Sequence, residues 1–396
     1  MSFESLIGQT PAKNYLRSVL ASGRRGHAFL FKGPAGVGKR TAAYLFAQRI
    51  LCHHPVGPPA PDRFCAECRS CRWFARRSGA QIEHPDVIGL LKPADARLVG
   101  DHEPVIPLDT VQYVCEQLHR SPVAGNYRAV IVPEAQRLCR GHAEAANAFL
   151  KTLEEPPAAS LIVLTSSQPE SLLETIVSRV QAVTFKRLSA DEIRIGLSGK
   201  NAPVAEIETV SHLCDGSLGR ALELLQGDLK GWRSAVIKEL QGFSARSCPQ
   251  FGLALWAAAD AEGARLFAAE EAAAKEEKDI EESAAPGDEA DEADTKTETG
   301  WKRYVFRRML EICEVCFRDG MIRASTPLGS QNGAESGLLL QPDQAALADA
   351  LAQKFGASGC MKALSALRES LFAVRLYVRG DVVGRALAGR LVEALT

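Results

Sequence analysis

The chain has 396 residues, 46% of them hydrophobic, and a formal net charge of −1. This length accommodates two or three domains with cores of their own, and the near-zero net charge excludes a protein coated throughout with basic residues. No apolar run approaches the roughly 20 residues that a membrane-spanning helix needs, and residues 1–9 lack the pattern of a secretory signal. We therefore expect a cytoplasmic protein that makes no contact with a membrane.

The stretch from His27 to Thr41 predicts a strand, a glycine-rich turn and a helix. Residues 33–39 fit the G-x-x-x-x-G-K pattern of a phosphate-binding loop, in which backbone N–H groups converge on an anion and the lysine reaches the outer phosphates. The alternative is a glycine turn that only packs the helix against the strand. The candidate nucleotide-binding residues of this stretch are Gly33, Gly36, Val37, Gly38, Lys39, Arg40 and Thr41.

Four cysteines follow the predicted helix 41–51 at a spacing typical of a metal site. Two C-x-x-C turns and one distant thiol supply four soft ligands, which suits a tetrahedral, structural Zn²⁺ with no open position. Metal binding would also stabilise a segment, about 52–75, that has few apolar residues. Reduced loop cysteines, or a ligand from His53 or His54 in place of the first cysteine, are the alternatives. The candidate ligands are Cys52, Cys65, Cys68 and Cys71.

Further strands and helices alternate along the rest of the first half of the chain. This alternation predicts a parallel sheet flanked by helices, and hence an α/β fold. Ser167 and Glu170 have the spacing of a capping box, which predicts that a short helix begins there. We expect strands at 86–91, 128–132, 161–164 and 183–185, and helices at 108–120 and 144–155.

Two positions argue against magnesium-dependent hydrolysis of a nucleotide. Arg40 stands where a phosphate-binding loop carries Ser or Thr, and Thr41 is displaced by about 100° around the helix. After the strand 128–132, Pro133 replaces the acidic metal ligand, while Glu134 keeps the carboxylate that would polarise a water molecule. We therefore expect a degenerate site that takes ATP or ADP and disfavours Mg²⁺.

The second half of the chain is predicted to be helical. A capping box from Ser189 to Glu192 opens this region. Arg220 falls in the first turn of a later helix, where a cation is unfavourable, so it either has an anionic partner or is solvated. Residues from about 268 to 300 are so acidic that we expect a disordered insert, although its first part is compatible with a helix.

Together these motifs resemble the bacterial clamp-loader subunits of DNA polymerase III, and are most similar to those of the delta-prime type. The resemblance covers residues 1 to about 225. It implies an AAA+ base with an inserted zinc module (1–187), a helical lid (188–228) and a helical collar (229–396). The residues that carry it are Ile7-Gly8-Gln9, the stretch from His27 to Pro34, the four cysteines, the stretch from Asn147 to Pro157 and Ser178-Arg179.

The resemblance also implies roles for individual residues. Arg179 would act as an arginine finger in the ATP site of a neighbouring subunit, and Val180 takes the place of the cysteine that usually follows it. Thr165 and Arg220 correspond to the nucleotide-sensing positions of the sheet and the lid. A helix from Glu134 would face duplex DNA, with Arg137 and Arg140 as candidate phosphate contacts, or as ordinary surface arginines.

Three functions compete at this level. The leading interpretation is a subunit that hydrolyses no ATP itself, assembles with gamma/tau and delta subunits in a hetero-pentamer, and helps to load the sliding clamp on primed DNA. The second is a gamma/tau-type motor, which Lys39 and Glu134 would suit. The third is a zinc-dependent adaptor or nucleic-acid-binding protein that uses the fold only as a scaffold.

Overall fold

The computed structural model separates into two compact units. The first comprises the described residues up to 200 together with Cys214–Leu222, and the second comprises 202–213 and the described residues from 223 onward. No helix in these ranges is long and apolar enough to cross a membrane. The residues described are 2–22, 26–57, 61–78, 81–82, 84–89, 106–139, 144–200, 202–226, 229–243, 248–278, 297–325, 339, 341 and 344–395.

A five-stranded parallel sheet forms the centre of the first unit, in the order β4-β5-β6-β1-β7. When these five strands are numbered 1 to 5 by their order in the chain, the order across the sheet is 2-3-4-1-5. Strand β6, the fourth in the chain, therefore lies between the third strand, β5, and the first, β1. The sheet confirms the predicted α/β fold. Its strands are β1 (Ala28–Lys32), β4 (Val87–Gly89), β5 (Arg128–Val132), β6 (Ser160–Ser166) and β7 (Gln181–Thr184).

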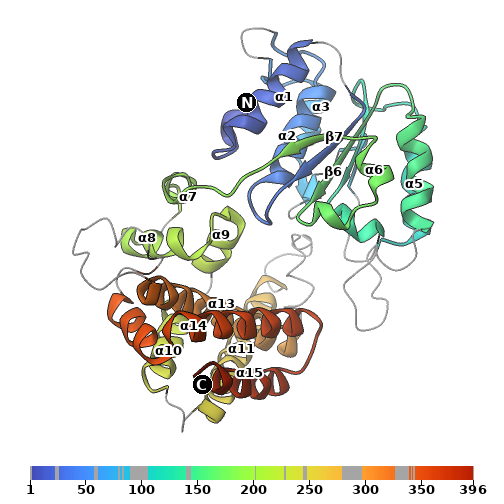
Figure 1. Cartoon of the computed structure of the whole chain (residues 1–396). Helices are drawn as coiled ribbons and strands as arrows, with labels where there is room; N and C mark the ends of the chain where they lie inside the picture. The colour runs from blue at the N-terminus through green and yellow to red at the C-terminus, as the bar shows by residue number, and fades with distance from the viewer. Residues whose placement is uncertain are drawn as a thin grey trace. The chain divides into compact units, whose positions relative to one another are not determined.

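Helices cover both faces of this sheet (Figure 1). Side chains alternate along each strand, so Phe29 and Phe31 pack on one side with α1 and α2, while Ala28 and Leu30 pack on the other with α4 and α5. All four side chains are buried. The helices of these layers are α1 (Thr10–Ser22), α2 (Lys39–Leu51), α4 (Leu108–Leu118) and α5 (Glu144–Glu154).

Shorter elements fill the connections of the first unit. A capping box closes the start of α7, as predicted, because the Ser189 hydroxyl accepts the Glu192 N–H and the Glu192 carboxylate accepts the Ser189 N–H. These elements are η1 (Phe3–Ser5), α3 (Arg69–Phe74), β2 (Arg77–Ser78), β3 (Gln81–Ile82), η3 (Ala135–Cys139), η4 (Pro169–Ser171), α6 (Glu174–Val177), α7 (Ala190–Leu197) and the start of α9 (Leu218–Gln226).

The second unit is helical. Its long helix α13 packs against both α11 and α14, and α15 packs against the same two helices. Arg308 on α13 is buried and pairs with Glu223 and Glu311. The helices are α8 (Val204–Leu213), α10 (Leu229–Gln241), α11 (Cys248–Lys278), α13 (Glu298–Ser325), α14 (Ala345–Arg375) and α15 (Gly380–Leu395).

Some local predictions differ from the structure. Helix α2 begins at Lys39 rather than residue 41, and a 3-10 helix, Ala135–Cys139, follows β5 where a helix from Glu134 was expected. The capping box at Ser167 is wrong: η4 has Gln168 at its N-cap, with no side-chain cap. Helix α11 reaches Lys278, so the acidic stretch is helical in its first part, and residues 279–296 lie outside the described chain.

Candidate nucleotide site and metal centre

The candidate nucleotide site lies where three neighbouring strands of the sheet end. The loop after β1 carries the glycines and Lys39, Glu134 follows β5, and Thr165 lies near the end of β6. Since the carboxyl ends of parallel strands share one edge, these residues come together. The Thr165 Oγ1 accepts a hydrogen bond from the Glu134 N–H at 3.3 Å.

The Lys39 side chain folds back onto its own loop. Its Nζ donates to the carbonyl oxygens of Gly33 at 2.7 Å and Pro34 at 2.6 Å, and the residue is buried. Burial lowers the pKa of Lys39, against the opposing charge of Glu134. These carbonyls therefore take the place that the outer phosphates of a nucleotide would occupy as partners of the amine.

The start of α9 lies directly on the phosphate-binding loop. The Gly219 N–H donates to the Gly36 carbonyl at 2.9 Å. Gly36 has a φ of +68°, and a Cβ there would lie 2.1 Å from the Ser217 Oγ, so only glycine fits between the loop and the start of α9. Ser217 also accepts the Arg220 N–H at 3.2 Å, which caps α9.

Gln9 joins the phosphate-binding loop to the segment that leads to the lid. Its amide donates to the carbonyls of Val37 at 3.3 Å and Lys186 at 2.6 Å, and its Oε1 accepts the Lys186 N–H at 2.9 Å. The side chain is buried. Gln9 therefore connects the loop, at Val37, to Lys186, which lies 177 residues after Gln9 in the chain.

Polar neighbours fix the Glu134 carboxylate. Its Oε2 accepts hydrogen bonds from Ser167 Oγ at 2.5 Å and Gln136 Nε2 at 2.6 Å. Gln136 in turn accepts the Ser166 hydroxyl at 2.7 Å. Glu134 has a φ of +46°, a strained conformation for a residue with a side chain. The carboxylate is thus engaged within the chain rather than aimed at a free water molecule.

The remaining candidates of the nucleotide site are less closely joined to it. Thr41 is exposed on α2, Arg40 is half-buried, and Val37 is buried beneath the loop. Arg220 is half-buried in the first turn of α9, as predicted. Arg137, a candidate DNA contact, is half-buried on η3, while Arg140 lies outside the described residues.

Arg179 follows α6 and is held at the surface. Its guanidinium donates to the Thr175 carbonyl at 2.9 Å and lies 3.3 Å from the Ser178 Oγ. The Glu154 carboxylate at the end of α5 lies 2.5 Å from its NH2. An exposed pair of this kind stabilises the fold by only about 0–1 kcal/mol, so its main effect is to orient the arginine.

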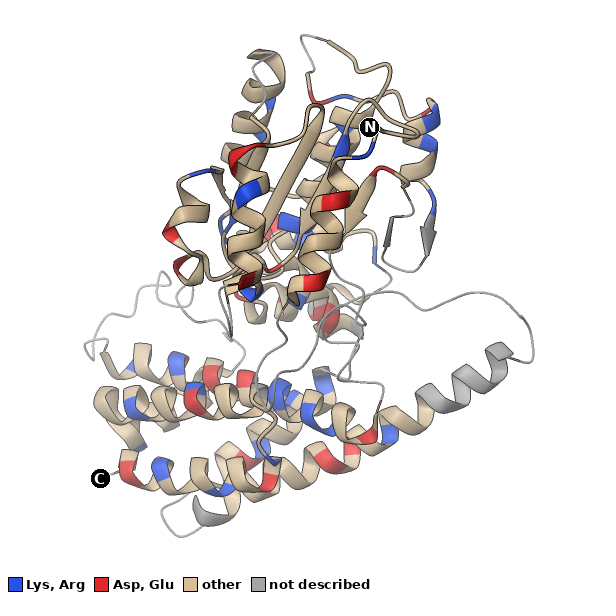
Figure 2. Ribbon diagram, turned by 90° about the vertical axis from the view of Figure 1, so that its right-hand side faces the viewer, with Lys and Arg blue, Asp and Glu red and all other residues tan. Residues whose placement is uncertain are grey.

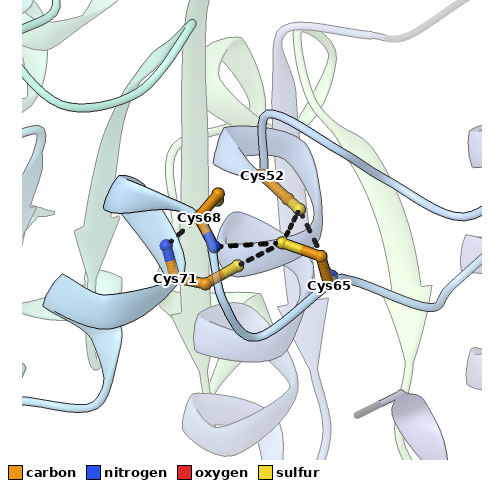
Figure 3. Close-up of side chains that lie close together, drawn as sticks. All are labelled: Cys52, Cys65, Cys68 and Cys71. Atoms are coloured by element: carbon orange, nitrogen blue, oxygen red, sulfur yellow. Dashed lines mark hydrogen bonds between the residues drawn. The ribbon is translucent and has the colours of Figure 1, made fainter.

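The four predicted cysteines come together in the structure (Figure 3). Their sulfur atoms all lie within 4.8 Å of one another, with 3.5 Å between Cys52 and Cys65 and 3.9 Å between Cys65 and Cys71. A tetrahedral ion with 2.3 Å bonds requires sulfurs about 3.8 Å apart, so the cluster could hold such a metal. His53 instead hydrogen-bonds to the Ala124 carbonyl at 2.6 Å, which leaves Cys52 as the fourth ligand.

Backbone N–H groups and burial act in opposite directions on these thiols. Burial acts to raise the pKa of Cys65, yet the N–H groups of Cys68 and Glu67 outweigh it and lower this pKa to about 6. Burial raises the pKa of Cys52 and of Cys71. A metal must displace protons from the buried thiols of Cys52 and Cys71. The affinity of the cluster for a metal will therefore fall as the solution becomes more acidic.

Two buried polar residues just before β4 connect it to other segments: His84 to the cysteine module, and Asp86 to the loop 123–125. His84 Nδ1 accepts the Asp86 N–H, which places the proton on Nε2, where it donates to Ser70 Oγ at 3.0 Å. The Asp86 carboxylate accepts three backbone N–H groups of residues 123–125, at 2.6 to 2.7 Å. The motifs of the sequence gave no signal for either role, nor for those of Gln9 and Gly219.

Comparison with known proteins gives consistent matches. Residues 8–189 match the family model described as "DNA polymerase III, delta subunit". A stretch covering 56% of this chain is 31% identical to the DNA polymerase III subunit tau of Bacillus subtilis, and covers 37% of that protein. A stretch covering 54% of this chain is 31% identical to the DNA polymerase III subunit delta' of Pseudomonas aeruginosa, and covers 60% of it.

These matches span only part of the relatives. The chain covers less than two thirds of the length of either protein, and less of tau than of delta'. Among solved structures, a DNA polymerase III gamma subunit-related protein of Thermotoga maritima aligns over 97% of this chain and 99% of its own, at 16% identity and a TM-score of 0.37.

Proposed function

We propose that this chain is a delta-prime-like stator of the bacterial DNA polymerase III clamp loader, because residues 8–189 match the family model and similar stretches match subunits tau and delta'. It joins gamma/tau and delta subunits in a hetero-pentamer that loads the sliding clamp on primed DNA. It hydrolyses no ATP with its own site and supplies Arg179 to the site of a neighbour. The observation that supports this most is the state of the phosphate-binding loop.

The loop lacks what hydrolysis requires at several points. Arg40 and Pro133 replace both side chains that would hold Mg²⁺, and neither an arginine nor a proline side chain can coordinate this ion. Lys39 is bonded to its own loop, and Glu134 to Ser167 and Gln136. ATP or ADP would have to displace the lysine contacts and the lid contact at Gly36 before its phosphates could bind.

Arg179 is suited to act outside its own chain. It lies at the surface after a four-residue helix, and its backbone and Glu154 contacts limit where the guanidinium can point. A fixed guanidinium from a neighbour neutralises charge that develops on the γ-phosphate in the transition state. In the assembled ring the guanidinium would exchange its exposed Glu154 partner for that phosphate.

The cysteine cluster is proposed to hold a structural Zn²⁺. All four positions are filled by thiols, which leaves no place for a catalytic water molecule. The module it organises has a small apolar core, made by Phe64 with Cys52 and Cys71. Zinc would therefore supply folding free energy rather than chemistry.

A gamma/tau-type motor is the second candidate. The match to subunit tau and the presence of both Lys39 and Glu134 favour it. In either function, Arg137 and Arg140 are proposed phosphate contacts to the duplex. Such contacts would make binding to DNA independent of sequence and sensitive to salt.

ATP binding and hydrolysis by the isolated, zinc-loaded chain distinguish stator from motor. We expect no turnover, and weak binding that Mg²⁺ does not strengthen. The test variant is Lys39→Ala. Its control is Lys32→Ala, which removes a lysine just before the loop. Steady, Mg²⁺-dependent turnover that is lost in Lys39→Ala and kept in Lys32→Ala would establish the motor instead.

A further inference from the structure

An open pocket of about 320 Å³ lies beside the cysteine cluster, on the short helix α3 and its flanks. It contains three arginines, one tryptophan and one acidic residue, so its side chains carry a net charge of +2. Neither the nucleotide site nor Arg179 uses it. Its lining residues are Glu67, Cys68, Arg69, Arg72, Trp73 and Arg76.

The three arginines lie along one side of a continuous helical path. Arg69 and Arg72 are three residues apart on α3, and Arg76 follows four residues later. The path continues past the end of α3, because the N–H groups of Ala75 and Arg76 donate to the carbonyls of Arg72 and Trp73. Residues three and four apart on a helix are neighbours about 5–6 Å apart at Cβ, so the three guanidinium groups form a row. Basic positions along this segment are blue in Figure 2.

These arginines have no carboxylate partner in the described part of the chain. All three are exposed, and no acidic side chain there lies within 4.0 Å of their guanidinium nitrogens. Arg72 is fixed by a backbone contact instead, donating from Nε to the Glu67 carbonyl at 2.8 Å. The row is thus oriented and still free to bind an anion.

Trp73 adds an aromatic surface to the row. It is half-buried, and the Arg76 guanidinium carbon lies 4.2 Å from the centroid of its ring. Arginine stacked on an indole is a stable cation–π pair that still leaves guanidinium N–H donors for a second partner. Basic side chains interleaved with an aromatic ring are typical of surfaces that bind single-stranded nucleic acid.

We propose that this arginine row, defined as Arg69, Arg72 and Arg76 with Trp73, binds the phosphate backbone of single-stranded DNA. The guanidinium groups contact successive phosphates, and Trp73 stacks on a base, so binding does not depend on sequence. An acidic polypeptide would use the arginines alone and would gain nothing from the indole, which is why we favour nucleic acid. The proposal requires neither Arg179 nor ATP.

A purely structural role for the same arginines makes a different prediction. Four thiolates with one Zn²⁺ carry a net charge of −2, which nearby cations would partly neutralise. In that case, removing the arginines would lower zinc retention and stability without any effect on DNA. Zinc content and thermal unfolding must therefore be measured beside DNA binding.

The test is the binding of a labelled oligothymidylate of about 20 nucleotides to the full, zinc-loaded chain, followed by fluorescence anisotropy at several salt concentrations. In the triple variant Arg69→Ala, Arg72→Ala, Arg76→Ala we expect affinity at low salt to fall at least about tenfold. The slope of log K against log salt should become less negative by about 2, because three phosphate contacts on a single strand contribute about −0.7 each. Trp73→Ala should weaken binding with little change in that slope.

The matched control removes the same charge elsewhere, through Lys200→Ala, Lys230→Ala and Lys238→Ala, all exposed lysines. The proposal is overturned if the control weakens binding as much as the arginine variant, or if the arginine variant retains zinc and still binds DNA normally. It is equally overturned if polyglutamate of equal charge competes as well as the oligothymidylate and Trp73→Ala has no effect, since an acidic polypeptide would then be the ligand. If the triple variant loses zinc, DNA binding is measured instead for Trp73→Ala and for the single arginine variants that retain zinc. The proposal is then overturned if none of these variants binds DNA more weakly than the lysine control.

Discussion

Single side chains determine what the phosphate-binding loop can do. The Lys39 amine is buried, and a buried ammonium without acceptors would be strongly destabilising. The carbonyls of Gly33 and Pro34 supply those acceptors within the loop itself. If a nucleotide binds at this site as proposed, Lys39 must exchange these carbonyls for phosphates, and only phosphates that bind it more strongly can drive the exchange.

His84 makes the stability of the protein depend on pH. Burial lowers the pKa of His84 to about 4, although Asp86 opposes this shift. An unfolded histidine titrates near 6.5, so between these two values the unfolded chain binds one more proton than the folded chain. The free energy of unfolding must then fall as pH is lowered through this window, by up to about 3 kcal/mol from His84.

We predict that His84→Gln will remove most of this pH dependence, because the amide can still bond Ser70 and the Asp86 N–H but takes up no proton. Urea unfolding of variant and wild type at about pH 7 and about pH 4.5 measures the effect. Zinc release contributes equally to both chains and cancels in the comparison. His119→Gln, at an exposed histidine, is the control. An equal loss of unfolding free energy in wild type and His84→Gln would contradict this role.

Residues within a motif could be predicted, whereas residues that act across the fold could not. Lys39 and the four cysteines are marked by local spacing. Gln9 hydrogen-bonds to Lys186, 177 residues away, and Asp86 binds a loop 37 to 39 residues further on. Such contacts depend on the finished fold, and neither residue type nor spacing in a single sequence indicates them.

At the level of elements, we expect the segment that carries the four cysteines to depend on the metal that we propose for it. Apart from the thiols, few side chains are buried among the described residues of this segment, and Phe64 and Phe74 are the large apolar ones. In the described part of this segment the regular structure is the short helix α3, which an antiparallel pair of two-residue strands, β2 and β3, follows. Metal binding would connect α2, through Cys52, to α3, through Cys71, and would therefore fix the module against the sheet.

We predict that Cys65→Ser will lose zinc and lower the melting temperature, while leaving the ATPase activity of a reconstituted loader intact where the chain remains folded. Cys139→Ser, a half-buried cysteine outside the cluster, should keep about one zinc per chain. Elemental analysis and thermal unfolding with and without a chelator measure both effects. A Cys65→Ser chain that lacks zinc and unfolds at the wild-type temperature would exclude a structural role for the metal.

The periodic pattern of apolar residues made most helices and strands predictable. The exceptions occur where polar side chains form hydrogen bonds with other parts of the fold. The strand β5 and the helix α5 fall where their apolar patterns place them. At Ser167, the hydroxyl binds the Glu134 carboxylate across the sheet edge instead of capping the helix after it. After β5, the turn at Glu134 leads into a 3-10 helix, in which Gln136 donates to the Glu134 carboxylate and accepts the Ser166 hydroxyl of β6.

At the level of the whole molecule, an α/β unit with a lid segment and a helical unit occur in one chain, and each has a core of its own. The first unit contains every candidate site residue that the structure describes. Within it, the loop contacts of Lys39, Gly219 and Gln9 favour a scaffold over a motor. We propose that such a scaffold acts through Arg179, which would enter the ATP site of a neighbouring subunit.

The ATPase rate of a loader reconstituted from gamma/tau, delta and this chain, in the presence of primed DNA and clamp, tests that claim most directly. We predict that Arg179→Ala abolishes the share of turnover from the adjoining site, since an arginine finger accelerates its site by about 10³-fold or more. Arg179→Lys should not restore it, and Arg194→Ala, at a half-buried arginine of α7 that pairs with Asp191, should have no effect. A loader that contains Arg179→Ala and hydrolyses ATP at the full wild-type rate would contradict the account.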